Sequence, residues 1–95
     1  MVPILKEIQA GTEHRLPSAQ VTVGRSGTDI TIDDPEVSRK HCLIKVFGDR
    51  IVIIDLDSTN GTYVDGKKVK TADLGVSERF SIGNSVFELA VKKAD

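Results

Sequence analysis

Short runs in which every second residue is apolar recur along this chain, and they restrict the possible fold more than any other feature. The runs 21–23, 30–32, 80–82 and 87–91 place their larger apolar side chains at alternate positions. A period of two predicts β-strands that bury one face and expose the other. No window carries the apolar spacing of an amphipathic helix, although 71–76 could form one helical turn.

Two-residue turn pairs separate several of these runs. The pairs are Gly-Asp at 48–49, Asp-Gly at 65–66 and Gly-Asn at 83–84. Such pairs tolerate positive φ and close tight hairpins between antiparallel strands. Many short strands joined by frequent turns predict an all-β fold, an antiparallel sandwich of two sheets.

The size and composition fit one small domain. The chain has 95 residues, so we expect a single domain over 1–95, with its core at about 4–91 and a tail or linker start at 92–95. With 39% hydrophobic and 28% charged residues, it is too apolar for a disordered chain and too polar for a membrane span. The first residues resemble no signal peptide, and we expect a soluble, intracellular protein of the cytoplasm.

Charge and aromatic content argue against a nucleic-acid-binding protein. The chain carries 13 basic and 14 acidic residues, a formal net charge of -1, and has three Phe, one Tyr and no Trp. Proteins that bind nucleic acid usually carry a basic excess and aromatic side chains on which bases stack. Any anion-binding site must therefore depend on a local group of donors, because the net charge of the chain does not attract anions.

Three loop segments and one hairpin carry polar residues that a strand scaffold does not require, at 23–26, 37–41, 57–62 and 65–66. Loops at strand ends are where a rigid scaffold presents functional groups. Together they supply a guanidinium, hydroxyls, a second cation and an amide, carried by Arg25, Ser38, Arg39, Thr59 and Asn60. This set of donors suits a phosphate, which accepts several charge-assisted hydrogen bonds at once.

The order of three short motifs resembles that of the forkhead-associated (FHA) domains. They are Gly-Arg at 24–25, Ser-Arg-Lys-His at 38–41 and Asn-Gly at 60–61, and the resemblance extends over about 4–91. Each motif alone is common, whereas three in order on an all-strand pattern are specific. The resemblance implies a two-sheet sandwich of about eleven short strands, with loops at one end that bind phosphothreonine peptides.

The resemblance also implies roles for single residues. Arg25 and Ser38 would bind the phosphate directly, the hydroxyl of Thr59 would contact it, and Arg39 would assist. Asn60 would hold the backbone of the ligand. The alternatives are structural, since an arginine on a turn, a serine that caps one and an Asn-Gly corner all occur without a ligand.

Three further residues, Gly24, His41 and Gly61, resemble those that shape the binding loops without contacting the ligand. His41 beside Cys42 also invites a catalytic interpretation, but adjacent strand residues project to opposite faces. We therefore expect His41 to bond the backbone of a loop and Cys42 to be a small buried apolar residue.

Glu36 lies two positions before Ser38, where some members of the family read a ligand residue beyond the phosphothreonine. A carboxylate there would disfavour an acidic ligand residue at that position.

Enzymatic function finds little support in the sequence. Asp55 and Asp57 could form a carboxylate pair, but no proton donor or metal partner accompanies them, and we interpret them as solvated or turn-stabilising. Two histidines and one cysteine make no recognisable metal set, and one cysteine allows no internal disulfide. We expect no catalysis, metal or cofactor, and neither nucleic acid nor membrane as partner. The predicted function is recognition of phosphothreonine proteins downstream of Ser/Thr kinases, and the alternative is phosphate-independent protein binding through a sheet face.

Overall fold

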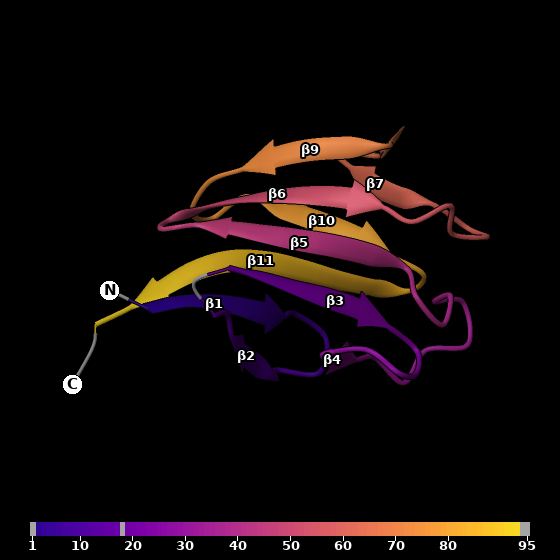
Figure 1. Ribbon diagram of the computed structural model, residues 1–95, viewed down its shortest axis with the longest axis horizontal. Coiled ribbons are helices and arrows are strands. Elements are labelled where there is room, and N and C mark those ends of the chain that lie inside the picture. The colour runs from indigo at the N-terminus through magenta and orange to yellow at the C-terminus, as the bar shows by residue number, and fades with distance from the viewer. Residues whose placement is uncertain (1, 18, 94–95) are drawn as a thin grey trace.

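The computed structural model describes residues 2–17 and 19–93, and these form eleven strands without a helix (Figure 1). The many two-residue turns keep most of the strands short, as the sequence pattern predicted. In chain order the strands are β1 (Val2–Glu7), β2 (Glu13–Arg15), β3 (Gln20–Gly24), β4 (Ile30–Thr31), β5 (Cys42–Phe47), β6 (Arg50–Asp55), β7 (Thr62–Val64), β8 (Lys67–Val69), β9 (Thr71–Leu74), β10 (Arg79–Ile82) and β11 (Ser85–Lys92).

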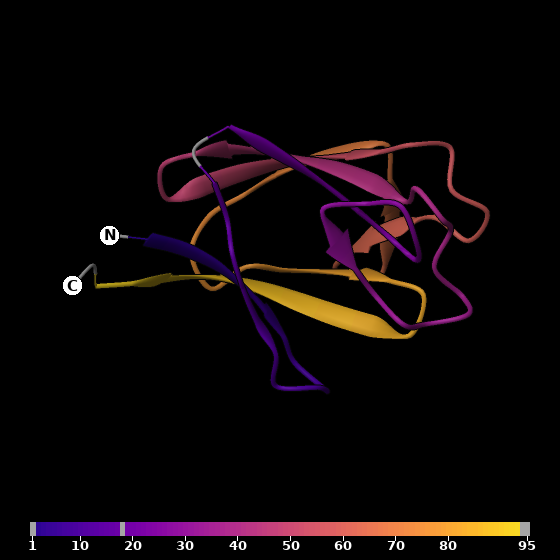
Figure 2. The same ribbon diagram turned by 60° about the horizontal axis from the view of Figure 1, so that its bottom comes forward.

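The strands form two sheets that face each other, which confirms the predicted sandwich (Figure 2). The order is β2-β1-β11-β10-β7-β8 in one sheet and β4-β3-β5-β6-β9 in the other. Apolar side chains from both inner faces fill the space between the sheets. The rings of Phe80 and Phe87 stack there, with their centroids 5.3 Å apart. Cys42 is completely buried in this core.

The three predicted hairpins are confirmed. The strand pairs close at Phe47–Arg50, Val64–Lys67 and Ile82–Ser85. In the turn at 65–66 both residues have positive φ, 51° and 75°, which a twisted two-residue hairpin favours.

Two details differ from the sequence prediction. The strands are antiparallel except for the short pair of β3 and β4, which is parallel. In the short connection between them, the Asp29 carboxylate accepts the N–H and the hydroxyl of Thr22 at 2.9 and 3.1 Å. The helical turn considered for 71–76 was wrong, because Thr71–Leu74 pairs with β6 as an edge strand and buries Leu74.

The start of β1 and the end of β11 lie together, away from the loops that follow β3, β4 and β6 (Figures 1 and 2). Val2 of β1 is paired with Lys92 of β11, so regular pairing extends slightly beyond the predicted core of 4–91. Residues 94–95 of the predicted tail lie outside the described residues. Within the described ranges, no helix is long and apolar enough to span a membrane.

Candidate functional site

Three loops meet at the end of the sandwich opposite the start of β1 and the end of β11 (Figures 1 and 2). They are the loop 25–29 after β3, the loop 32–41 between β4 and β5, and the loop 56–61 between β6 and β7. All residues predicted to bind or shape a phosphate site lie on them or, for Gly24, at the end of the strand before. The hairpin at 65–66 does not join this group, because it closes the other end of β7.

Backbone hydrogen bonds join the first loop to the second. The N–H of Arg25 donates to the carbonyl of Ser38 at 3.0 Å, and the N–H of Ser26 donates to the carbonyl of Arg39 at 3.4 Å. Gly24 makes this approach possible, because a Cβ at that position would lie 1.9 Å from the Arg39 carbonyl oxygen. The side chains of Arg25 and Arg39 belong to exposed residues and are available to an anion.

A side-chain hydrogen bond joins the second loop to the third. The N–H of Thr59 donates to Oγ of Ser38 at 3.0 Å. Because the oxygen of this hydroxyl accepts from Thr59, its own proton can donate elsewhere. The contact brings the Ser38 hydroxyl to the backbone of Thr59, and the Ser38 carbonyl accepts the N–H of Arg25 on its other side.

His41 lies beneath this junction and is completely buried. Its Nδ1 accepts the N–H of Ser38 at 3.1 Å, and its Nε2 lies 2.8 Å from the carbonyl oxygen of Gly61. Since an N–H can only donate and a carbonyl can only accept, the proton of the neutral ring belongs on Nε2. The imidazole therefore links the second and third loops from inside.

Asn60 and Glu36 form a second link between the same loops at the surface. The side-chain Nδ2 of Asn60 donates to the backbone carbonyl of Glu36 at 2.9 Å and to its carboxylate Oε2 at 3.0 Å. Both residues are exposed. The amide oxygen of Asn60 has no hydrogen bond within residues 2–17 and 19–93, which leaves it as an acceptor at the surface.

A buried carboxylate, Asp34, anchors the second loop to the β10–β11 hairpin. It accepts the N–H of Glu36 at 2.9 Å, the N–H of Asn84 at 2.8 Å and the hydroxyl of Ser85 at 2.9 Å. Burial raises the pKa of the Asp34 carboxyl, but these hydrogen bonds lower it by more, and the pKa lies below its ordinary value of 3.8. Sequence reasoning missed this residue, because its partners at 84–85 are distant in the chain.

Asp55 anchors the third loop in the same way. Its carboxylate accepts the hydroxyl of Ser58 at 2.6 Å and that of Thr62 at 2.8 Å. Burial raises the pKa of Asp55, while the bonds from Ser58 and Thr62 lower it by more, so the pKa is again below 3.8. Asp55 therefore stabilises a turn, whereas Asp57 is exposed and pairs with Lys70 at 3.0 Å.

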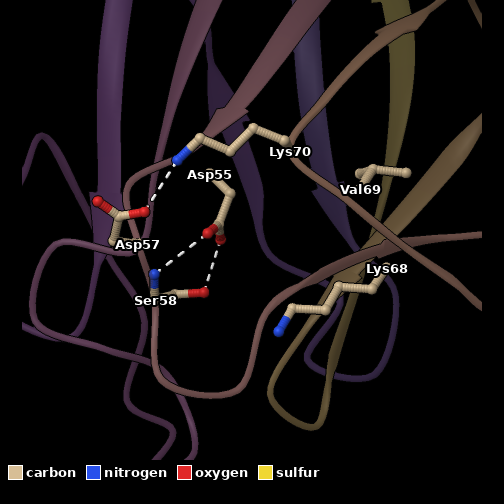
Figure 3. A pocket seen from close by; sticks show the side chains of 6 residues that line it. All are labelled: Asp55, Asp57, Ser58, Lys68, Val69 and Lys70. Carbon is tan, nitrogen blue, oxygen red and sulfur yellow. Dashed lines mark hydrogen bonds and ion pairs between the residues drawn. The ribbon is translucent and has the colours of Figure 1, made fainter.

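A cavity of about 460 Å³ lies between residues 55–58, where β6 leads into the third loop, and residues 68–70 (Figure 3). Its lining residues are Asp55, Asp57, Ser58, Lys68, Val69 and Lys70. None of the predicted phosphate ligands lines it, so the candidate site is an exposed junction of loops rather than this cavity. In residues 2–17 and 19–93 no group of three or more His, Cys, Asp or Glu side chains could hold a metal ion.

Comparison with known proteins identifies the family. The model of the FHA domain matches residues 21–83, which include all three loops of the junction. The chain belongs to the FHA domain family. This FHA domain superimposes with a TM-score of 0.89 and 25% identity on a solved domain from a structural and functional analysis of phosphothreonine-dependent FHA domain interactions, covering 99% of this chain and 100% of that one.

Two mycobacterial proteins are also similar to this FHA domain. It is 35% identical over 75 residues to the glycogen accumulation regulator GarA of Mycolicibacterium smegmatis, covering 78% of this chain and 48% of GarA. It matches the structure of Mycobacterium tuberculosis EmbR in complex with a low-affinity phosphopeptide with a TM-score of 0.87 and 29% identity, covering 99% of this chain and 25% of EmbR. The FHA domain thus spans about half of GarA and a quarter of EmbR.

Proposed function

We propose that this FHA domain binds protein segments that contain phosphothreonine. The observation that carries the proposal is the junction at Ser38. Its carbonyl accepts the backbone N–H of Arg25, and its hydroxyl oxygen accepts the backbone N–H of Thr59. These contacts hold the backbones of Arg25 and Thr59 against Ser38, and Arg25 and Thr59 are exposed while Ser38 is half-buried, which supports a site built from their side chains. The EmbR phosphopeptide complex and the phosphothreonine-dependent FHA interactions reported for related domains support the same function.

In this proposal the phosphate accepts from the planar guanidinium of Arg25 and from the hydroxyl proton of Ser38. Thr59 and Arg39 supply further donors from either side. A phosphothreonine carries about -1.5 to -2 charges at neutral pH, and each hydrogen bond to a charged group contributes about 1.5–3 kcal/mol. Three or four such bonds contribute a gross binding free energy of about 6–10 kcal/mol. The entropy lost when an extended peptide becomes ordered offsets part of this gain. We expect micromolar affinity, about -8 kcal/mol.

The remaining predicted residues shape or extend the site. Gly24, His41 and Gly61 hold the loops in register, and the amide of Asn60 bonds the ligand backbone. The carboxylate of Glu36 disfavours an acidic residue a few positions beyond the phosphothreonine. A module of this kind recognises a ligand without catalysis, and it couples Ser/Thr kinases of the cytoplasm to protein assembly.

Isothermal titration of a degenerate phosphothreonine peptide pool tests the proposal, with the unphosphorylated pool as reference. Wild type should bind only the phosphorylated pool, and Arg25→Ala should lower its affinity by at least about tenfold. Arg15→Ala is the matched control, because Arg15 is an exposed arginine on β2, outside the three loops. Equal binding of both pools, or an Arg25→Ala protein that binds as wild type does, would instead favour a phosphate-independent contact through a sheet face.

A further inference from the structure

We propose, on the basis of the phosphopeptide function above, that Glu36 is a positioning residue for Asn60. It fixes the side-chain amide of Asn60 so that only the amide oxygen faces the ligand. Asn60 then accepts a backbone N–H of the peptide and donates nothing to it. This role is separate from any repulsion between the Glu36 charge and the ligand.

The orientation of the Asn60 amide follows from the chemistry of its partners. Both groups of Glu36 that contact it, the backbone carbonyl and the carboxylate, can only accept hydrogen bonds. The NH2 group must therefore point to Glu36, and its two protons are both used there. What remains for a ligand is the oxygen, which is a group that backbone N–H donors bind.

The backbone of Glu36 is itself held in place by a buried side chain. Its N–H donates to the buried Asp34 carboxylate, which also accepts from Asn84 and Ser85 on the β10–β11 hairpin. The loop that carries Glu36 is thus fixed to strands of the sandwich. A side chain fixed in advance loses little conformational entropy when the ligand binds.

Two variants separate positioning from charge. Glu36→Gln keeps an oxygen that accepts from Asn60 and removes the charge, whereas Glu36→Ala removes the side-chain acceptor as well. For a phosphothreonine peptide without acidic flanking residues, Glu36→Gln should bind within about twofold of wild type. Glu36→Ala should bind about three- to fivefold more weakly, the effect of one hydrogen bond. Asp33→Ala is the matched control, an exposed carboxylate of the same loop, and should bind as wild type does.

A double-mutant cycle tests whether Glu36 acts through Asn60. In an Asn60→Ala background the further change Glu36→Ala should have no effect on affinity, because there is no amide left to position. A second series uses peptides that are N-methylated at one backbone position each. At one position the methyl group should lower the affinity of the wild-type protein by about fivefold, and at that position it should leave the affinity of Asn60→Ala unchanged. The proposal is overturned if Glu36→Gln and Glu36→Ala change affinity equally, or if the loss in Glu36→Ala persists without Asn60.

A measurement without ligand distinguishes this inference from the proposed function. In NMR spectra of the free protein, the side-chain NH2 signals of Asn60 should shift in Glu36→Ala and stay near their wild-type positions in Asp33→Ala. Unchanged Asn60 signals in Glu36→Ala overturn the positioning role even if phosphopeptide binds. If the signals shift but wild type binds no phosphopeptide, the phosphopeptide function fails, and with it the ligand-facing role of the Asn60 oxygen.

Discussion

Ser38 donates its backbone N–H to Nδ1 of the buried His41 imidazole at 3.1 Å, while its own side chain faces the exposed junction of three loops. The other ring nitrogen of His41 bonds the carbonyl of Gly61. One side chain thus sets the distance between the loop that carries Ser38 and the loop that carries Thr59 and Asn60. The surface chemistry depends on this interior contact.

Replacement of His41 by alanine should therefore affect both stability and binding. The change removes two hydrogen bonds from a completely buried position and leaves a cavity, at an expected cost of about 2–4 kcal/mol in the free energy of unfolding. Urea denaturation measures this loss. Lys40→Ala, at the exposed neighbouring position, should leave the stability within about 0.5 kcal/mol of wild type. A fully stable His41→Ala protein would contradict the bridging role.

Replacement of Gly24 by alanine should separate the first two loops. The new methyl group would lie 1.9 Å from the Arg39 carbonyl oxygen, so the backbone contact between Arg25 and Ser38 cannot form without a shift. We expect a loss of phosphopeptide binding of about tenfold or more, together with a lower melting temperature. Gly27→Ala is the matched control. Gly27 has a φ of 71° but open space around it, so the change should cost only about 1 kcal/mol of stability. If the two variants bind equally well, close approach at Gly24 is not required.

The stability of the domain should fall in acid. The pKa of Asp34 is held below its ordinary value of 3.8, so the ionised carboxylate stabilises the fold at every pH above that value. The contribution is lost as the pH falls below 3.8 and through the lowered pKa. Denaturation curves from pH 6 to about pH 2 should show this decline, and Asp34→Asn should show a shallower one from a lower starting stability. If the stability of Asp34→Asn fell with pH as steeply as that of wild type, Asp34 would not contribute to the acid sensitivity of the domain.

Cys42 should resist thiol reagents in the folded protein. Burial and the nearby negative charge of Asp55 raise the pKa of its thiol to about 12, and the side chain is inaccessible. Because the thiolate is the reactive form, alkylation at pH 8 should proceed only as fast as the protein unfolds. The chain has one cysteine, so mass spectrometry reports this site alone, and urea-unfolded protein is the positive control. Rapid labelling of the native protein would show that the core opens around Cys42.

Phosphothreonine should bind more tightly than phosphoserine in an otherwise identical peptide. We expect the γ-methyl group of phosphothreonine to fill a small apolar notch beside the phosphate, and one buried methyl group contributes about 10- to 200-fold in affinity. Titration of the two peptides against wild type measures the ratio. Equal affinities would show that this domain lacks the notch.

Much of the fold could be predicted from the sequence because its signals are local. Alternation of apolar residues within a few positions defines strands such as β10 and β11, and a two-residue turn such as 65–66 carries its own backbone preference. The order of the Gly-Arg, Ser-x-x-His and Asn-Gly motifs was enough to identify the family. The edge strand Thr71–Leu74 was missed because few of its residues are buried, which leaves a weak apolar pattern.

The supporting contacts of the site could not be predicted, because they join distant parts of the chain. Asp34 bonds Ser85, 51 residues away, and the amide of Asn60 bonds Glu36, 24 residues away. Nothing in the local sequence at 33–36 distinguishes the buried carboxylate from its exposed neighbours. The parallel pairing of β4 with β3 and the contact of Asp29 with Thr22 beside it likewise have no periodic signal in the sequence.

The pairing of Val2 with Lys92 brings the first and last strands out of the sandwich at the pole opposite the loops. The domain is 38 Å long, and an extended chain advances about 3.3–3.6 Å per residue. A tether of about eleven extended residues is thus the minimum that would let a threonine in a flanking segment reach the junction of its own domain. With a shorter tether, a threonine in the flanking segment cannot reach the loops of its own domain, and only another molecule can supply the ligand.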